Sequence, residues 1–115
     1  MSYKSRKGKA ASGQAHAPAF AALGDETRLV LVAKLCKGRP YSISQLSRGS
    51  KLTRQAITKH LRVLESAGIV CHASKGREVL YQFNPQPIEE VREYLDLVSE
   101  QWDQALARLK AFVEG

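Results

Sequence analysis

The segment from Leu52 to Leu64 constrains the fold more than any other part of this 115-residue chain. Ile57, Leu61 and Leu64 recur at intervals of four and three residues, so they line one face of an α-helix. The opposite face carries polar and basic side chains of the kind that contact phosphates and base edges. A short helix and turn precede this segment and a basic hairpin follows it. This order predicts a mainly α fold with a small β-hairpin wing, the architecture of a winged helix-turn-helix.

Capping signals set the boundaries of the expected helices. Asp25 is the expected N-cap of one helix. Its apolar face is predicted from the helical spacing of Leu29, Val32, Ala33 and Cys36. Gly38 and Pro40 end this helix. The run Ser42-Ile43-Ser44-Gln45 has the pattern of a capping box and opens a two-turn helix. Thr53 caps the next helix, which runs to about Ala67 and ends at Gly68. The helix-turn-helix is therefore expected at residues 42–67.

Two short strands are expected after this helix, at 69–73 and 79–83, joined by a turn at 74–78 that contains a glycine. They form the wing, residues 69–83. Its tip is basic, with Lys75 and Arg77. Because an isolated two-stranded hairpin is only marginally stable in water, Tyr81 and Phe83 are expected to face the helical core.

The C-terminal segment, residues 87–114, predicts one long helix. Its apolar residues are separated alternately by three and four positions from Ile88 to Phe112, which is a heptad seam. So long a seam is better buried against a second chain than within one small domain, although packing on its own domain is the alternative. A short helix at residues 15–23, with Phe20 and Leu23 buried, completes the expected interface. The predicted dimer contacts are Phe20, Leu95, Val98, Trp102, Leu109 and Phe112.

Charge divides the chain. The formal net charge is +7, but residues 1–84 hold fifteen Lys and Arg against four Asp and Glu, whereas residues 85–115 hold three against seven. The basic part suits a polyanion and the acidic part does not. Residues 1–14 are rich in Ser, Gly, Lys and Ala and are expected to be a disordered basic tail, either an arm that contacts phosphates or a solubilising segment.

Double-stranded DNA is the polyanion that the helix favours, because a helix of this size fits the major groove. Gln55 is suited to adenine and an arginine to guanine, whereas Thr53 and Ser42 lie at helix starts that can hold phosphates. The wing would reach the neighbouring backbone or minor groove. For each side chain the alternative is a solvated surface position. The predicted DNA contacts are Ser42, Thr53, Arg54, Gln55, Thr58, Lys59, Arg62, Lys75 and Arg77.

Several classes of protein are disfavoured. No run of about 18 apolar residues predicts a membrane span, and the N-terminus has no apolar segment typical of a secretory signal. Two distant cysteines, Cys36 and Cys71, indicate a reduced cytoplasm; Cys36 is expected to be buried, and a redox pair is the alternative. No phosphate loop, activated nucleophile or carboxylate pair predicts an enzyme. His60, at the edge of the apolar face, is expected to be structural and bonded to backbone or phosphate, and a metal ligand is the alternative.

The chain resembles the ArsR/SmtB family of bacterial winged-helix repressors over residues 16–115. The resemblance is carried by Ala22-Leu23-Gly24-Asp25-Glu26-Thr27-Arg28, by Leu52–Leu64 with its Thr58-Lys59-His60-Leu61 centre, by Glu65-Ser66-Ala67-Gly68-Ile69-Val70, and by Gly76-Arg77 before Tyr81. It implies a homodimer built from the first and last helices. It also implies binding to a partly palindromic operator, usually in the promoter of the regulator's own operon.

The metal sites of the family's best-known members are missing from this sequence. Arsenic sensors carry Cys-Val-Cys where this chain has Ser42-Ile43-Ser44, and hydroxyls do not replace thiolates for a soft ion. Zinc sensors use His and acidic ligands on the last helix, which here has no His or Cys. We therefore expect no metal and no cofactor. The alternative function is a protein-interaction module that uses the heptad helix and is only tethered to nucleic acid.

Overall fold

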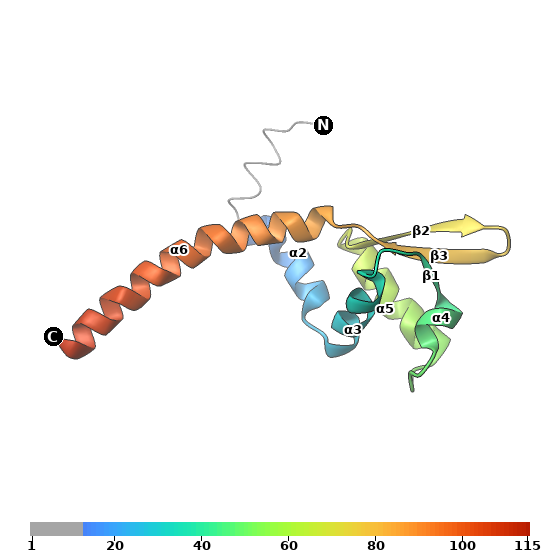
Figure 1. Ribbon diagram of the computed structural model, residues 1–115, viewed down its shortest axis with the longest axis horizontal. Helices are drawn as coiled ribbons and strands as arrows, with labels where there is room; N and C mark the ends of the chain where they lie inside the picture. The colour runs from blue at the N-terminus through green and yellow to red at the C-terminus, as the bar shows by residue number, and fades with distance from the viewer. Residues whose placement is uncertain (1–12) are drawn as a thin grey trace, which may run out of the picture. The chain divides into compact units, whose positions relative to one another are not determined.

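The computed structural model describes residues 13–115, which contain five helices and three strands within that range (Figure 1). They divide into two compact units, one spanning Ala17–Ile88 and the other containing Glu89–Gly115 with the start of the first helix up to His16. The mainly α composition with a small antiparallel sheet is confirmed. The elements are α2 (Gly13–Leu23), α3 (Glu26–Leu35), β1 (Tyr41–Ser42), α4 (Ile43–Ser47), α5 (Arg54–Ser66), β2 (Val70–Lys75), β3 (Glu78–Phe83) and α6 (Gln86–Glu114).

Helix α2 begins at Gly13, two residues earlier than expected, so the last two residues of the tail expected at 1–14 are helical instead. Residues 1–12 of that expected tail lie outside the described residues. The buried residues of α2 include Ala19 and Ala22 rather than Phe20, whose side chain is 37% exposed. The prediction that Phe20 is buried within its own chain is therefore wrong, and Leu23 is only half-buried. Small alanines allow the close packing, and the larger ring is left at the surface.

Helix α3 starts as predicted, with Asp25 as its N-cap and the carboxylate accepting a hydrogen bond from the backbone N–H of Arg28 at 3.0 Å. The predicted apolar face is wrong. Leu31 and Leu35 are buried, whereas Leu29 is 51% exposed and Cys36 is exposed at the C-cap. Leu31 and Leu35 also have helical spacing. Because this helix is apolar on several sides, either the predicted face or the face with Leu31 and Leu35 could pack against the core.

The capping box of α4 is present, with Ser42 Oγ accepting from the N–H of Gln45 and the Gln45 side chain accepting from the N–H of Ser42. The residues before it form a strand that the sequence did not reveal. Strand β1 pairs with β3 through Tyr41 and Tyr81, so the predicted hairpin is in fact a three-stranded antiparallel sheet of order β1-β3-β2. A strand of two residues is too short to show an alternating pattern.

Helix α5 agrees with its prediction at both ends. Thr53 Oγ1 accepts from the N–H of Ala56 at 3.0 Å, Ala67 is the C-cap, and Gly68 follows with a positive φ of 77°. The amphipathic pattern is also confirmed, because one face of α5 is buried in the centre of the core. The largest fully buried side chains of the described chain are Leu35, Leu46, Ile57, Leu61, Leu64, Ile69 and Val70.

The β2–β3 hairpin has a tighter turn than the five residues expected. Lys75 pairs with Glu78, which leaves only Gly76 and Arg77 as central residues of the turn. Gly76 has a φ of 63°, a left-handed conformation that glycine adopts without strain. Tyr81 is buried as predicted, and Phe83 is half-buried. The hairpin extends past the helices that precede it in Figure 1.

Helix α6 has 29 residues and begins at Gln86, one residue before the expected start. In the unit that contains most of it, Val91 and Val98 are buried and the ring of His16 lies 4.9 Å from that of Tyr94. Beyond Glu100 every residue is exposed. Among residues 13–115, no helix combines the length and the apolar character that crossing a membrane requires.

Candidate nucleic-acid interface

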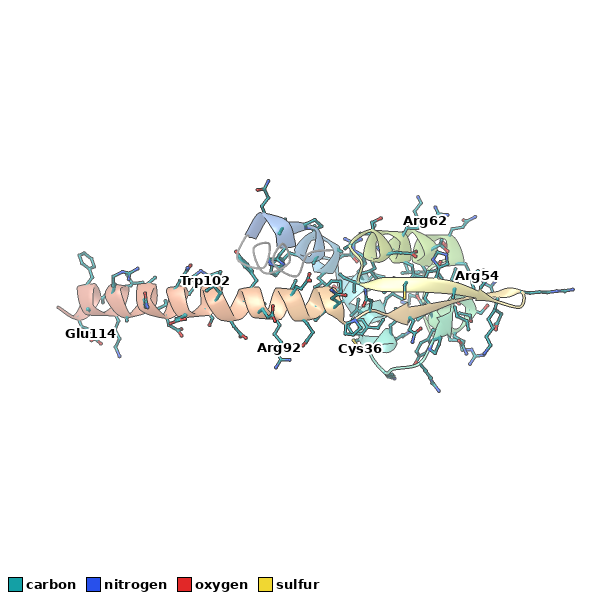
Figure 2. The ribbon with its side chains drawn as sticks, turned by 90° about the horizontal axis from the view of Figure 1, so that it is seen from above. Cys36, Arg54, Arg62, Arg92, Trp102 and Glu114 are labelled. Carbon is teal, nitrogen blue, oxygen red and sulfur yellow. The ribbon has the colours of Figure 1, made fainter. Side chains whose placement is uncertain are left out.

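Five of the predicted DNA contacts lie together on the outer face of α5. They line an open hollow of about 380 Å³ on the helix surface opposite the buried leucines. Figure 2 labels the first and last of them, Arg54 and Arg62. The face therefore combines three cationic groups with an amide and a hydroxyl, which are the donors and acceptors that phosphates and base edges pair with. We call this set the α5 hollow: Arg54, Gln55, Thr58, Lys59 and Arg62.

The start of α5 is held by side-chain hydrogen bonds. Arg54 Nη2 donates to Ser44 Oγ on α4, and Thr58 Oγ1 donates to the carbonyl of Arg54 at 2.8 Å. The guanidinium carries five N–H donors, so this bond leaves others for a ligand. Ser44 was not among the predicted site residues. Its contact joins the two helices of the helix-turn-helix, and the sequence offered no signal for it beyond its place beside the capping box.

Ser42 lies apart from this surface. Its side chain is buried, and its hydroxyl is occupied as the cap of α4. The structure thus gives Ser42 a structural role, and its contact with phosphate stays a prediction. Thr53 is exposed at the first turn of α5 but also uses its hydroxyl as a cap.

The wing presents Lys75 and Arg77 at its exposed turn, as the sequence predicted. Glu78 pairs opposite Lys75 and reduces the positive charge there. Farther along the hairpin, His72 Nδ1 lies 2.6 Å from Glu65 Oε2 on α5, which links the sheet to the helix. The sequence did not indicate that Glu65 or Glu78 would pair with residues of the wing.

Burial also affects one titrating group beside this link. Burial raises the pKa of the Tyr81 hydroxyl above its ordinary value of 10.0, and the nearby carboxylate of Glu65 acts in the same direction, whereas Arg62 opposes it. The ring of Tyr81 lies 5.5 Å from that of His72. A neutral tyrosine therefore closes the inner side of the wing.

His60 occupies the boundary position that was expected, half-buried on α5. Its partner is a side chain rather than backbone or phosphate: Nδ1 lies 3.2 Å from Arg28 Nη1 and 4.0 Å from Asp25 Oδ1. A structural role for His60 is thus supported, with a partner from α3 that sequence spacing did not indicate.

Comparison with known proteins decides the family. The model of the bacterial regulatory proteins of the arsR family matches residues 25–71, from the cap of α3 into β2. The HTH-type transcriptional regulator Rv2034 of Mycobacterium tuberculosis is 35% identical over 97 residues, which cover 84% of this chain and 87% of the relative. The chain belongs to the ArsR family. It is a DNA-binding transcriptional regulator with a winged helix-turn-helix fold, from a family of regulators rather than enzymes.

Other members agree in sequence and in fold. An ArsR-like transcriptional regulator from Rhodococcus sp. RHA1 superposes with a TM-score of 0.69 at 35% identity, covering 84% of this chain and 91% of that one. The uncharacterized HTH-type regulator YuzN of Bacillus subtilis is 37% identical over 76 residues, 61% of this chain and 83% of the relative. The similarity extends beyond the segment that the family model matches.

This ArsR-family chain has hydroxyls at the two positions where the resemblance implies thiolates in arsenic sensors. Ser42 and Ser44 flank Ile43 at the junction of β1 and α4. Within residues 13–115, no group of three or more His, Cys, Asp or Glu side chains lies close enough to hold a metal ion. Cys36 and Cys71 are free and exposed, so the expected burial of Cys36 is wrong. The absence of a metal requirement stays a prediction.

The predicted dimer contacts are spread over α2 and α6. Trp102 is 60% exposed and Phe112 84% exposed, and Leu95 and Leu109 also present apolar surface to solvent. Figure 2 shows the Trp102 side chain standing out from α6. Val98 is only 8% exposed, so it has little surface left for a partner.

Proposed function

We propose that this regulator binds a partly palindromic operator as a homodimer and represses the promoter of its own operon, acting in the cytoplasm where that DNA lies. Helix α5 enters the major groove, and the turn of the wing contacts the adjacent backbone or minor groove. The observation that carries the proposal is the α5 hollow, because five polar side chains share the solvent face of a helix whose other face anchors the core.

The roles of the side chains follow from their chemistry. Gln55 can donate to and accept from adenine, and Arg62 can donate twice to guanine. Lys59, Lys75 and Arg77 add positive charge that pairs with phosphates without reading sequence. Arg54, held by Ser44, is suited to a fixed phosphate or base contact near the start of the helix.

Dimerisation is proposed from the exposed seam of α6. Large apolar side chains that recur at alternate spacings of three and four residues are costly to leave in water, and a second copy of α6 offers a matching seam. Two copies of α5 related by a two-fold axis would address half-sites about one helical turn, or a multiple, apart.

Footprinting on the DNA upstream of the regulator's own gene tests the proposal. The purified protein is titrated against this DNA and against random DNA of equal length at physiological salt, with and without thiol oxidants and metal ions. A repressor prefers its promoter by about a thousandfold or more. Equal affinity for the two DNAs would favour the second candidate, a protein-interaction module tethered to nucleic acid, which the exposed C-terminal part of α6 also suits.

A further inference from the structure

Arg28 joins three elements of the unit that contains the helix-turn-helix. Its Nε donates to the carbonyl of Ala22 at 2.6 Å, and Nη2 reaches the carbonyl of Ala21 at 3.4 Å. These carbonyls belong to the last turn of α2, and the carbonyl of Ala21 also accepts from the backbone N–H of Gly24 at 3.2 Å. The same guanidinium approaches His60 on α5 through Nη1. Arg28 thus links the end of α2, the first turn of α3 and the middle of the recognition helix.

The chemistry of the two side chains fixes the direction of the Arg28–His60 hydrogen bond. A guanidinium has only donors and remains charged at all accessible pH values. A hydrogen bond between them therefore requires His60 Nδ1 to act as the acceptor, which only an imidazole with its proton on Nε2 alone can provide. The charged groups that face the ring are Arg28 and Asp25, both from the start of α3. The side-chain bonds of α4 and β2 to α5 lie elsewhere, at Arg54 and Glu65.

We propose that Arg28 and His60 are positioning residues for DNA recognition, which hold α5 at a fixed orientation to α2 and α3, and that this hold requires a neutral imidazole. The inference rests on the proposed reading of DNA by α5. His60 lies between Lys59 and Arg62 in sequence, so a rotation of α5 that breaks its bond to Arg28 moves the side chains of the α5 hollow with it.

Protonation of the His60 imidazole would break its hydrogen bond with Arg28. A proton on Nδ1 turns the acceptor into a donor and sets a second cation against the guanidinium, while Asp25, at 4.0 Å, is the group that an imidazolium would turn to. Acidification should therefore release α5 from Arg28 without removing any group that contacts DNA. The affinity for the promoter would fall, and the affinity for random DNA, which depends on charge alone, would not.

Four variants separate positioning from folding. His60→Asn places an amide oxygen at the position of Nδ1 and cannot be protonated, whereas His60→Leu keeps the volume and removes the acceptor. Arg28→Lys keeps the charge and loses the fork of donors, and Arg28→Met loses both. Fluorescence anisotropy measures affinity for promoter and random DNA from pH 8 to pH 5.5, and circular dichroism monitors unfolding.

We expect His60→Leu and Arg28→Met to lose promoter affinity by about tenfold at pH 8, as for a lost hydrogen bond to a charged group. His60→Leu removes no charge at this pH and should bind random DNA as before. Arg28→Lys should fall between Arg28→Met and the natural protein. His60→Asn should bind the promoter within about threefold of the natural protein. Acidification should weaken promoter binding by the natural protein, and this dependence should be absent from His60→Asn.

Two results would overturn the inference. One is unchanged promoter affinity in His60→Leu and Arg28→Met; the other is an equal loss on both DNAs, accompanied by a lowered unfolding temperature, which would mean that the pair only supports the fold. Failure of the proposed function would be visible separately, because the natural protein itself would then bind promoter and random DNA alike.

Discussion

His72 on β2 and Glu65 on α5 form a hydrogen-bonded pair, with 2.6 Å between Nδ1 and Oε2. The pair connects β2 to the last turn of α5, and its two residues lie on either side of Gly68, which follows the C-cap Ala67. Because the ring of His72 also lies beside that of Tyr81, the hairpin is held on its inner side by a polar contact and an aromatic one. We therefore expect this link to help fix the position of the basic turn relative to α5.

Replacing His72 by alanine should loosen the wing with little loss of stability. Both partners are partly exposed, so the pair contributes only about 0.2–1 kcal/mol to the free energy of unfolding. Amide hydrogen exchange should accelerate at Lys75–Glu78, and the affinity for DNA should fall. Ser74→Ala, on the same face of β2 but without a partner on α5 to lose, is the matched control. Equal exchange in the two variants would argue against the link.

Arg62→Ala should erode the preference for the promoter. Arg62 belongs to the α5 hollow, and an arginine that pairs with guanine contributes about 1–3 kcal/mol of discrimination. Competition binding with promoter and random DNA measures the ratio of affinities. Arg92→Ala, which removes an exposed arginine from α6, controls for the lost charge. If the two variants retained the same preference, the base contact assigned to Arg62 would be wrong.

Lys75→Ala should weaken binding to every DNA by a similar factor. A lysine at the turn of the wing pairs with phosphate, which carries no sequence information. The slope of log affinity against log salt should become shallower by about one. Lys110→Ala on α6 removes the same charge away from the wing and should leave the slope unchanged. A loss confined to the promoter would instead assign Lys75 to base recognition.

We expect the ionisation of Asp25 to make the free energy of unfolding depend on pH in the acid range. The backbone N–H of Arg28 donates to the carboxylate and holds the pKa of Asp25 below its ordinary value of 3.8. The ionised form therefore stabilises the folded state; this contribution is complete above that value and is lost as the pH falls through the lower pKa of the folded protein. Asp25→Asn keeps a capping oxygen but no charge, so its free energy of unfolding should fall less between pH 5 and pH 2. Denaturant unfolding across this range tests the expectation; parallel profiles for the two proteins would contradict it.

Local chemistry explains what the sequence could predict. Caps such as Asp25, Ser42 and Thr53 act within three residues of themselves, so the starts of α3, α4 and α5 follow from spacing alone. The amphipathic pattern of α5 is equally local. This spacing alone separates the buried leucines from the α5 hollow, because both sets lie within one helix.

Contacts between distant segments explain what the sequence could not predict. Strand β1 exists because Tyr41 meets Tyr81, forty residues farther along the chain. The bond between Arg28 and His60 is similarly non-local, and no periodicity indicates it. For α3 the spacing predicts the wrong buried face, because apolar residues occupy several of its sides and only packing against other elements selects Leu31 and Leu35.

Trp102→Glu should yield monomers and abolish tight promoter binding together. Trp102 belongs to the heptad seam of α6 and is 60% exposed in a single chain, so a carboxylate there would be buried without a partner if two seams met. Gln101→Glu adds the same charge at an exposed neighbouring position that lies off the seam, and it should remain dimeric. Analytical ultracentrifugation gives the mass, and anisotropy with one and two half-sites gives the affinity. Because two linked copies of α5 bind a two-fold site by avidity, separating them should reduce affinity by a factor of a hundred or more, about the gain that linkage confers. A monomeric Trp102→Glu protein that still bound the full operator tightly would contradict the proposal that tight DNA binding requires the dimer.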